Sequence, residues 1–401
     1  MNKKFLDKNW LIKIADNPII FICILCFLLR LVFCFFIFPI IGLPNIESVD
    51  IDHHGAIASS IYHGHGSVAE SASQSRIARG SLYPLFLAFI YTIFGGENLL
   101  FVQFAQSLLG VFTCFVVYVI AHKIFGKKTA LISALLVTFY PPFIWYTARI
   151  WTETMLTFLV SILVLCLIQF LSSPTKRKAL LLGAMLGFVN LCKPLLIFLP
   201  LLLLFVLVAL YGTRKKEIIV NIFLIALSMF LVISPMIYRN YKMSDHSVFV
   251  ETLARNIIGG DLNIEKGIGL KEKRLLSNRE ILDTYDSIIR SIELKSGKRY
   301  GVAEQDVVML NYLFHKYLSS PLFLLKKMAI QSVQFWYLGG SKGRCLLFAI
   351  MQLSLLIPGL LGIFFAIKNK LFVLPLLLII FYFVFVHSLV ITSARYSIPI
   401  M

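Results

Sequence analysis

Apolar runs of about 20 residues recur along the whole sequence, and this feature limits the possible folds more than any other. A helix of that length crosses the roughly 30 Å hydrocarbon core of a bilayer. Lipid offers no partners to free backbone N–H and C=O groups, so each run should be helical. Only 14% of the 401 residues are charged, against about 25% in soluble domains. The sequence therefore predicts an all-α polytopic membrane protein.

The positive charge lies between the apolar runs. The formal net charge is +18, which in a soluble protein would suggest nucleic acid. Here Lys and Arg form short clusters, as expected for cytoplasmic loops. We therefore expect no nucleic-acid partner and use the clusters to orient the chain. They are Lys3-Lys4 with Lys8 and Lys13, Lys127-Lys128, Lys176-Arg177-Lys178, Arg214-Lys215-Lys216, and Lys368 with Lys370.

The number of crossings follows if every cluster faces the cytoplasm, because the chain then crosses an even number of times between consecutive clusters. The 82–95 run is about 14 residues long, which suits a re-entrant or interfacial helix. Without the 82–95 run as a span, the chain crosses an even number of times between the first two clusters. The 321–340 run is interrupted by Lys326-Lys327 and is interpreted as a helix on the outer surface. With the N-terminus inside, we predict nine spans, at about 18–41, 99–122, 129–147, 151–171, 179–195, 197–211, 217–236, 345–367 and 371–392.

This topology divides the chain into three parts. The long polar stretch before residue 321 contains two amphipathic helical patterns, 281–294 and 307–318, separated by Gly297 and Gly301. It is interpreted as an outer segment that caps the site or holds an acceptor. The parts are an N-terminal transmembrane module (1–236) with its first outer loop (42–81), an extracytoplasmic segment with an interfacial helix (237–344), and C-terminal transmembrane helices (345–401).

Ionisable residues concentrate at the ends of predicted spans on the outer side. Such residues are costly at membrane depth and are therefore functional candidates. A pair of cations can hold a phosphate and stabilise it as it leaves, and a carboxylate can deprotonate an acceptor hydroxyl or amine. The set therefore suits transfer from a lipid-linked phosphate. It comprises Asp50, Asp52, His53, His54, Arg79, Tyr83, Arg149, Glu153, Lys193, Arg239, Arg395 and Tyr396.

Each candidate also has a structural explanation. Arg149 and Glu153 are four residues apart and would neutralise each other on a helix. Lys193 could extend to the interface. His53, His54, His63 and His65 do not have a recognised ligand spacing. The seven Cys lie in apolar runs and are expected to pack as small hydrophobic residues. We expect no cofactor, and a divalent metal remains a weaker alternative.

Short motifs follow one another on the predicted outer side. In order, they are Asp50 with Ala58, Ile61 with Gly64-His65-Gly66, Arg79 with Leu82-Tyr83-Pro84, Phe94-Gly95, Tyr140-Pro141 with Thr152-Glu153, Lys193-Pro194, Ser234-Pro235 to Arg239-Asn240-Tyr241, and Arg395-Tyr396-Ser397-Ile398-Pro399. The order resembles that of GT-C fold polytopic glycosyltransferases, family 39-like, in the branch of protein O-mannosyltransferases and lipid A aminoarabinose transferases.

The resemblance implies a hexosyl- or pentosyltransferase that uses a polyprenyl-phosphate sugar and inverts its stereochemistry. It implies that Asp50 is the base, with Asp52 as the alternative because Ile51 replaces the usual Glu. Other departures are His54 for Tyr, Gly80 for Pro and Met236 for Trp. By the same resemblance the donor site contains Arg79, Tyr83, Glu153, Lys193, Arg239, Arg395 and Tyr396.

The end of the chain also departs from the family. Family members usually add at least one more span after the position of Met401. The sequence is therefore interpreted as a truncated or naturally short form.

Two other functions compete with this reading. A transporter or flippase of lipid-linked sugars predicts ionisable residues at the bilayer midplane and an internal repeat, and we expect neither. A non-catalytic envelope-assembly protein is the second alternative. Short loops favour a bacterial inner membrane, and the acceptor is expected to be a lipid, a protein or a glycan.

Overall fold

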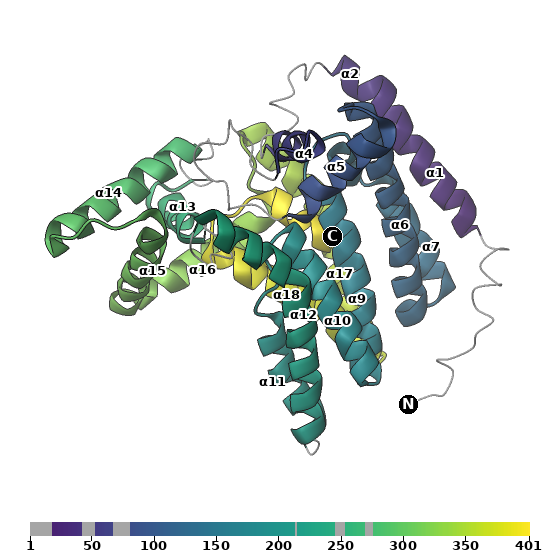
Figure 1. Ribbon diagram of the computed structural model, residues 1–401. Coiled ribbons are helices and arrows are strands. Elements are labelled where there is room, and N and C mark those ends of the chain that lie inside the picture. The colour runs from purple at the N-terminus through teal and green to yellow at the C-terminus, as the bar shows by residue number, and fades with distance from the viewer. Residues whose placement is uncertain (1–17, 42–52, 67–80, 213–214, 245–252, 269–275) are drawn as a thin grey trace. The chain divides into compact units, whose positions relative to one another are not determined.

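The computed structural model describes residues 18–41, 53–66, 81–212, 215–244, 253–268 and 276–401, and there the chain forms helices and no strand (Figure 1). The predicted all-α class is therefore confirmed for the described residues.

Five helical stretches are long and apolar enough to cross a membrane. They are Ile19–Ile40, which joins α1 (Ile19–Val32), η4 (Phe33–Ile37) and α2 (Phe38–Ile40), then α6 (Leu99–Phe125), α9 (Glu153–Ser172), Lys216–Lys242 within α12 (Lys215–Ser244), and α17 (Lys342–Lys368). A sixth is present if α7 (Lys127–Phe139) and α8 (Pro141–Thr147), bent by 50°, form one span.

The predicted total of nine crossings is not established. Three further predicted spans correspond to helices of 13 to 17 residues, α10 (Lys176–Cys192), α11 (Leu199–Tyr211) and α18 (Leu374–Leu389). Their lengths are below the roughly 20 residues of an upright span. The protein is therefore polytopic, while the number nine stays a prediction.

The two apolar runs that we excluded as spans are both short helices. α5 (Leu82–Phe94) has 13 residues and α16 (Pro321–Tyr337) has 17. Neither is among the helices that qualify as spans. Both lengths agree with the prediction from the sequence.

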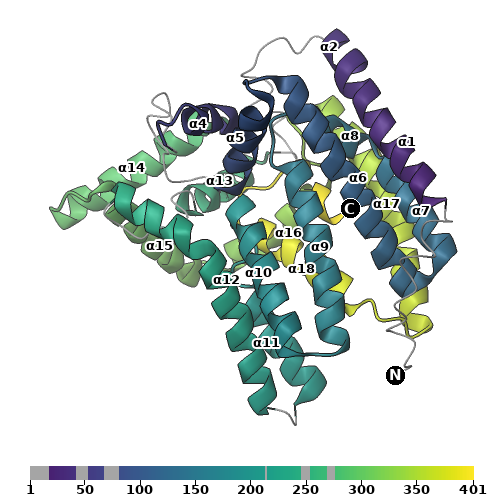
Figure 2. The same cartoon turned by 45° about the vertical axis from the view of Figure 1, so that its right-hand side comes forward.

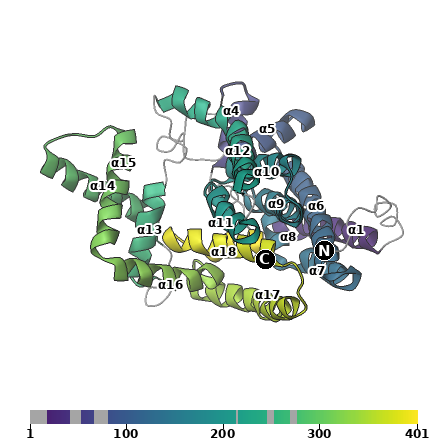
Figure 3. The same cartoon turned by 90° about the horizontal axis from the view of Figure 1, so that it is seen from below.

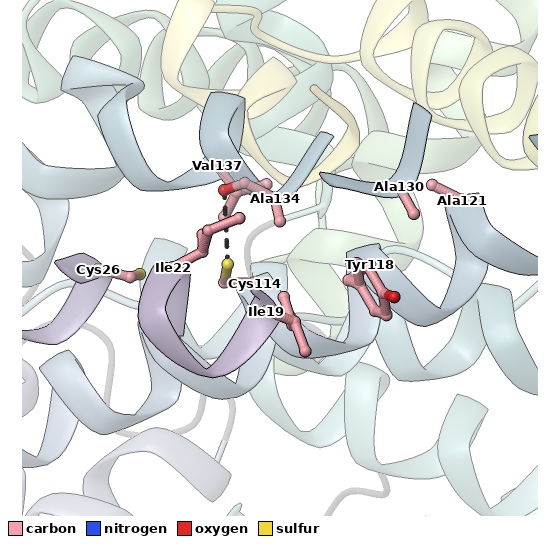
Figure 4. Packing of buried hydrophobic residues seen from close by; sticks show 9 residues of the cluster. All are labelled: Ile19, Ile22, Cys26, Cys114, Tyr118, Ala121, Ala130, Ala134 and Val137. Carbon is pink, nitrogen blue, oxygen red and sulfur yellow. Dashed lines mark hydrogen bonds between the residues drawn. The ribbon is translucent and has the colours of Figure 1, made fainter. Parts of the chain in front are cut away.

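The chain divides into two compact units, and the first comprises 1–69 with 83–165. Its core lies where α1 packs against α6 and α7 (Figure 2). Ala130 and Ala134 of α7 are fully buried and allow close packing. The Cys114 thiol donates a hydrogen bond to the carbonyl of Ala134 at 3.4 Å (Figure 4).

A pair of prolines separates α7 from α8. Pro141 and Pro142 lack the N–H groups that would continue the α7 ladder. Tyr140, directly before them, is extended with φ −67° and ψ 113°, the region preferred before proline. The break therefore follows from the sequence Tyr140-Pro141-Pro142.

The second unit comprises 70–82 with 166–401. In it α10 and α12 lie side by side (Figure 1). A Cβ on Gly183 would collide with the carbonyl oxygen of Ile225, and one on Gly187 would meet the Val232 side chain. The two glycines therefore allow the helices to approach at backbone distance.

The described residues of the predicted extracytoplasmic segment form a small helical domain in this unit, here called the outer domain. Ile258 of α13 (Leu253–Glu265), Tyr285 of α14 (Asn278–Ser296) and Met309 of α15 (Val302–Ser319) share its core. Ser277 and Glu280 form a capping box before α14, and Gly297 ends it at φ +68°. Both predicted amphipathic helices are thus confirmed. α16 follows and packs against α18 (Figure 3).

Candidate functional site

The predicted site residues fall in both compact units, and each group is described within its own unit. Asp50, Asp52 and Arg79 lie outside the described residues. Their roles therefore stay predictions.

In the first unit, Arg149 lies between two tryptophan rings in the turn that joins α8 to α9. Its guanidinium carbon is 4.8 Å from the centroid of Trp145 and 5.0 Å from that of Trp151. Only 9% of Arg149 is exposed. Cation–π contact stabilises a guanidinium that has little water around it.

Two glutamines of α6 hold this turn. Gln106 Nε2 donates to the carbonyls of Arg149 at 2.7 Å and Thr147 at 3.0 Å. Gln103 Nε2 donates to the carbonyl of Ala148 at 3.0 Å. Neither glutamine was predicted, because amides spaced along an apolar helix give no motif. Their only signal in the sequence is a polar residue inside a span.

Glu153 is the first residue of α9 and is 1% exposed. A carboxylate is favoured at a helix N-terminus by the helix dipole. The expectation that Arg149 and Glu153 stand on one helix is wrong, because Arg149 precedes α9 in a bend. The helical i,i+4 explanation for this pair is therefore removed.

Tyr83 and His54 are buried together in the same unit. The Tyr83 ring is fully buried, and its hydroxyl donates to Gln106 Oε1 at 3.1 Å. His54 meets that ring edge-on, with centroids 5.3 Å apart. Gln106 thus connects the Tyr83 hydroxyl to the Arg149 turn.

His53 and His54 were predicted as loop residues, and this is correct only for His53. His54 opens α4 (His54–Tyr62) and is 5% exposed, whereas His53 precedes the helix in the left-handed region at φ 53°.

His63 pairs with Glu97, Nε2 to Oε1, at 2.9 Å. Within the described ranges no group of three or more His, Cys, Asp or Glu side chains could hold a metal. The first outer loop is mostly outside those ranges, so the expectation of no cofactor stays a prediction.

In the second unit, Lys193 and Arg395 both contact the ring of Tyr396. Lys193 Nζ is 4.1 Å from the Tyr396 ring centroid. The Arg395 guanidinium carbon is 5.2 Å from the same ring. His387 of α18 was not predicted. Its ring stacks on the ring of Tyr396, with the two centroids 5.1 Å apart. Two cations and an imidazole therefore gather around one aromatic ring.

The described contacts of Arg239 are with its neighbour on α12. Its Nε and Nη2 donate to Asn240 Oδ1 at 3.1 and 2.8 Å. Asn240 is fully buried, and Arg239 is half-buried. Contact between Arg239 and the Lys193 group is not among these described interactions.

The segment that carries Arg395 and Tyr396, η5 (Ala394–Ile400), is tied to the outer domain. The Ile391 amide donates to the carbonyl of Asn256 at 2.7 Å, and that of Ala394 donates to Leu338 at 2.9 Å. Two backbone bonds at the start of the segment therefore fix its path against α13 and the end of α16.

A buried ionic network joins α13 to α16. Lys327 is fully buried, and its Nζ donates to Asp261 Oδ1 at 2.7 Å and to the carbonyl of Ile257 at 3.0 Å. Lys316 Nζ donates to the other carboxylate oxygen, Asp261 Oδ2, at 2.8 Å. The Tyr317 hydroxyl donates to Asp261 Oδ1 at 2.7 Å. One carboxylate thus serves two ammonium groups.

The two lysines differ electrostatically. Burial lowers the pKa of Lys327 although Asp261 acts in the opposite direction. Burial also acts against the charge of Lys316, but Asp261 and Glu265, through their charges and hydrogen bonds, together raise the pKa of Lys316.

Comparison with known families finds a similarity over part of the chain. Residues 79–238 match the model of the dolichyl-phosphate-mannose-protein mannosyltransferase family. Over these residues the chain is similar to a family of membrane glycosyltransferases of the GT-C type. The family 39-like resemblance drawn from the motifs is thereby confirmed. No curated protein and no solved structure matches the chain. The matched part of the chain includes Tyr83, Glu153 and Lys193 and ends before Arg239.

Proposed function

We propose that this glycosyltransferase moves a sugar from a polyprenyl-phosphate donor to an extracytoplasmic acceptor with inversion at the anomeric carbon. The family match over residues 79–238 carries the proposal, because it covers the motifs with Tyr83, Glu153 and Lys193. A bacterial inner membrane is the proposed location. The acceptor is a lipid, a protein or a glycan.

The reaction has one displacement step. An acceptor oxygen or nitrogen attacks the anomeric carbon, a new glycosidic bond forms, and the bond from that carbon to the phosphate oxygen breaks. The electron pair leaves with the polyprenyl phosphate, and the acceptor proton passes to a carboxylate. Asp50 is the proposed base, with Asp52 as the alternative.

The leaving phosphate gains negative charge as the bond breaks, so cations placed beside it lower the barrier. Lys193 and Arg395 share the Tyr396 ring, which holds both side chains at one place. We assign these two cations, with Arg239 and Arg79, to the phosphate.

Glu153 is assigned to the sugar rather than the phosphate, because a carboxylate repels a phosphate. Its place at the start of α9, four residues after the turn held by Gln103 and Gln106, supports a fixed position. Tyr83 is assigned to the same donor site.

The base is tested by transfer of a radiolabelled lipid-linked sugar to membrane acceptors, measured for Asp50→Asn and Asp52→Asn. We expect Asp50→Asn to abolish transfer, since loss of a general base costs roughly 10²–10⁴-fold. Asp283→Asn, on an exposed turn of α14, is the matched control. Inactivity of Asp52→Asn alone would move the base to Asp52, and normal transfer by both variants would refute the mechanism.

Mass spectrometry of envelope glycans and glycolipids, with and without the protein, identifies the sugar and acceptor. We expect at least one glycoconjugate to disappear. The flippase alternative would be favoured instead if the donor accumulates on the cytoplasmic side while other proteins still transfer the sugar.

A further inference from the structure

Arg30 breaks the expectation that ionisable residues lie only at span ends. It stands near the middle of the 22-residue span Ile19–Ile40 and is 1% exposed. A guanidinium at that depth is costly and usually functional. Its sequence signal is a single Arg inside an apolar run, which the charge-cluster analysis did not use.

The Arg30 side chain bridges two elements of the first unit. Nη1 donates to the carbonyl of Cys26 at 3.1 Å and to its thiol sulfur at 2.7 Å, one turn back on α1. Nη2 donates to the carbonyl of Val137 on α7 at 3.1 Å. Space for the side chain comes from Gly110 of α6, where a Cβ would lie 2.9 Å from Arg30 Cδ.

The carbonyl of Val137 needs this partner for a reason that is visible in the sequence. In a continuous helix the N–H of residue 141 would bond to the carbonyl of residue 137. Residue 141 is proline and has no N–H. In a lipid environment water cannot replace the missing donor. Arg30 therefore supplies the hydrogen bond that Pro141 removes.

The break at Tyr140 leads directly to the candidate site. α8 carries Trp145, whose ring contacts the Arg149 guanidinium. The Trp145 ring also packs on Phe33 and Phe38, with centroids 6.1 and 6.0 Å apart. The first span thus contacts the Trp145 ring of α8 through Phe33 and Phe38, and the break before α8 through Arg30.

We propose that Arg30 is a positioning residue that holds the α7–α8 break and so fixes the turn bearing Arg149 ahead of Glu153. This role for transfer rests on the proposed function of the site. The stabilisation of the α7–α8 break by Arg30 is a property of the fold and is tested separately.

Hydrogen–deuterium exchange tests the hold without using activity. We expect Arg30→Met to increase deuterium uptake across residues 138–149 and to leave α10 and α12 unchanged. Gly110→Ala should do the same while keeping the guanidinium, because the added Cβ displaces it. Gly359→Ala, where a Cβ meets nothing within 4 Å, is the control. Unchanged uptake in both test variants would overturn the proposal.

Transfer kinetics test the consequence for the site. We expect kcat to fall roughly tenfold or more in both variants, since small displacements of aligned groups are costly, with donor KM changed less than about threefold. Normal kcat with raised uptake would show that Arg30 holds the break but does not position the site. If the parent protein transfers no sugar, the proposed function fails while the exchange result still decides the hold.

A proline replacement separates positioning from simple stabilisation. Pro141→Ala with Pro142→Ala restores both N–H groups. Added to Arg30→Met, this replacement should bring the melting temperature back to that of the parent. Transfer should not return, because a continuous helix would close the break. Recovery of stability and transfer together would show that Arg30 only stabilises the fold.

Discussion

At the scale of single residues, the cations around Tyr396 show how the fold gathers residues that the motifs list separately. Lys193 and Arg395 are about 200 positions apart in the chain, yet both contact one ring. The motifs predicted each residue separately. His387 was missed because its contact with Tyr396 depends on how α18 packs, which no local pattern records.

Lys193→Met should weaken donor binding, because an ammonium beside the phosphate is lost. We expect donor KM to rise roughly tenfold, in line with a lost charged hydrogen bond. Lys193→Arg should retain most activity, since the cation and its contact with the ring remain possible. Lys326→Met, at an exposed position of α16, is the control. Equal KM for Lys193→Met and the parent would remove Lys193 from the donor site.

Asp306 provides a test of the outer domain through pH. Burial raises its pKa above the usual value, although the hydroxyl of Tyr285, which donates to Oδ1 at 2.7 Å, opposes the shift. The folded form therefore binds this proton more tightly than the unfolded form does. Stability from this group is present at low pH and is lost as pH rises through the folded pKa.

The corresponding variant is Asp306→Asn, which cannot titrate. The difference in melting temperature between parent and variant should move in favour of the parent as pH falls from neutral toward 4. Parallel melting curves at every pH would contradict the raised pKa.

At the scale of elements, polar partners buried between helices set the geometry that apolar periodicity leaves open. The helices themselves were predictable because run length, prolines and glycines are local. The contacts of Gln106, Arg30 and Lys327 were not, because each joins residues far apart in sequence. The run 129–147 was predicted as one continuous span, but the structure breaks it at Tyr140 with a bend of 50° because of Pro141 and Pro142. The partner of this break on α1 was identified only from the structure.

Lys327→Met should destabilise the contact between α13 and α16. Removing one partner of a buried ion pair leaves an uncompensated charge and costs about 3–5 kcal/mol. Lys316 still contacts Asp261, so the loss should fall near the lower end. Thermal unfolding in detergent measures it, with Lys326→Met as the matched control. Asp261→Asn added to Lys327→Met should recover part of the loss, and no recovery would contradict the pairing.

At the scale of the whole molecule, the class of protein was readable from composition alone, and the number of crossings was not. Hydropathy supports a polytopic membrane protein, and the match over residues 79–238 supports a glycosyltransferase. The three short apolar helices α10, α11 and α18 decide between six and nine crossings. Helices of that length cross a membrane only when neighbours or local thinning accommodate them, so their number cannot be counted from the sequence.

Reporter fusions test the topology. Alkaline phosphatase, which is active only outside the cytoplasm, should be active when fused after Gly297 and inactive when fused after Thr175. Activity at both points would show that the basic clusters do not share one side. Inactivity at Gly297 would place the segment with α14 inside and remove the proposed outer site.

The glycine contacts between α10 and α12 limit the substitutions that homologues of this protein can carry at these positions. Lys193 directly follows α10 and Arg239 lies on α12, so the spacing of these helices also sets the spacing of two proposed phosphate ligands. A side chain at position 187 would press on Val232 and push the helices apart. We therefore expect natural variants that lose Gly187 to carry a smaller residue at position 232, so that the two positions change as a pair.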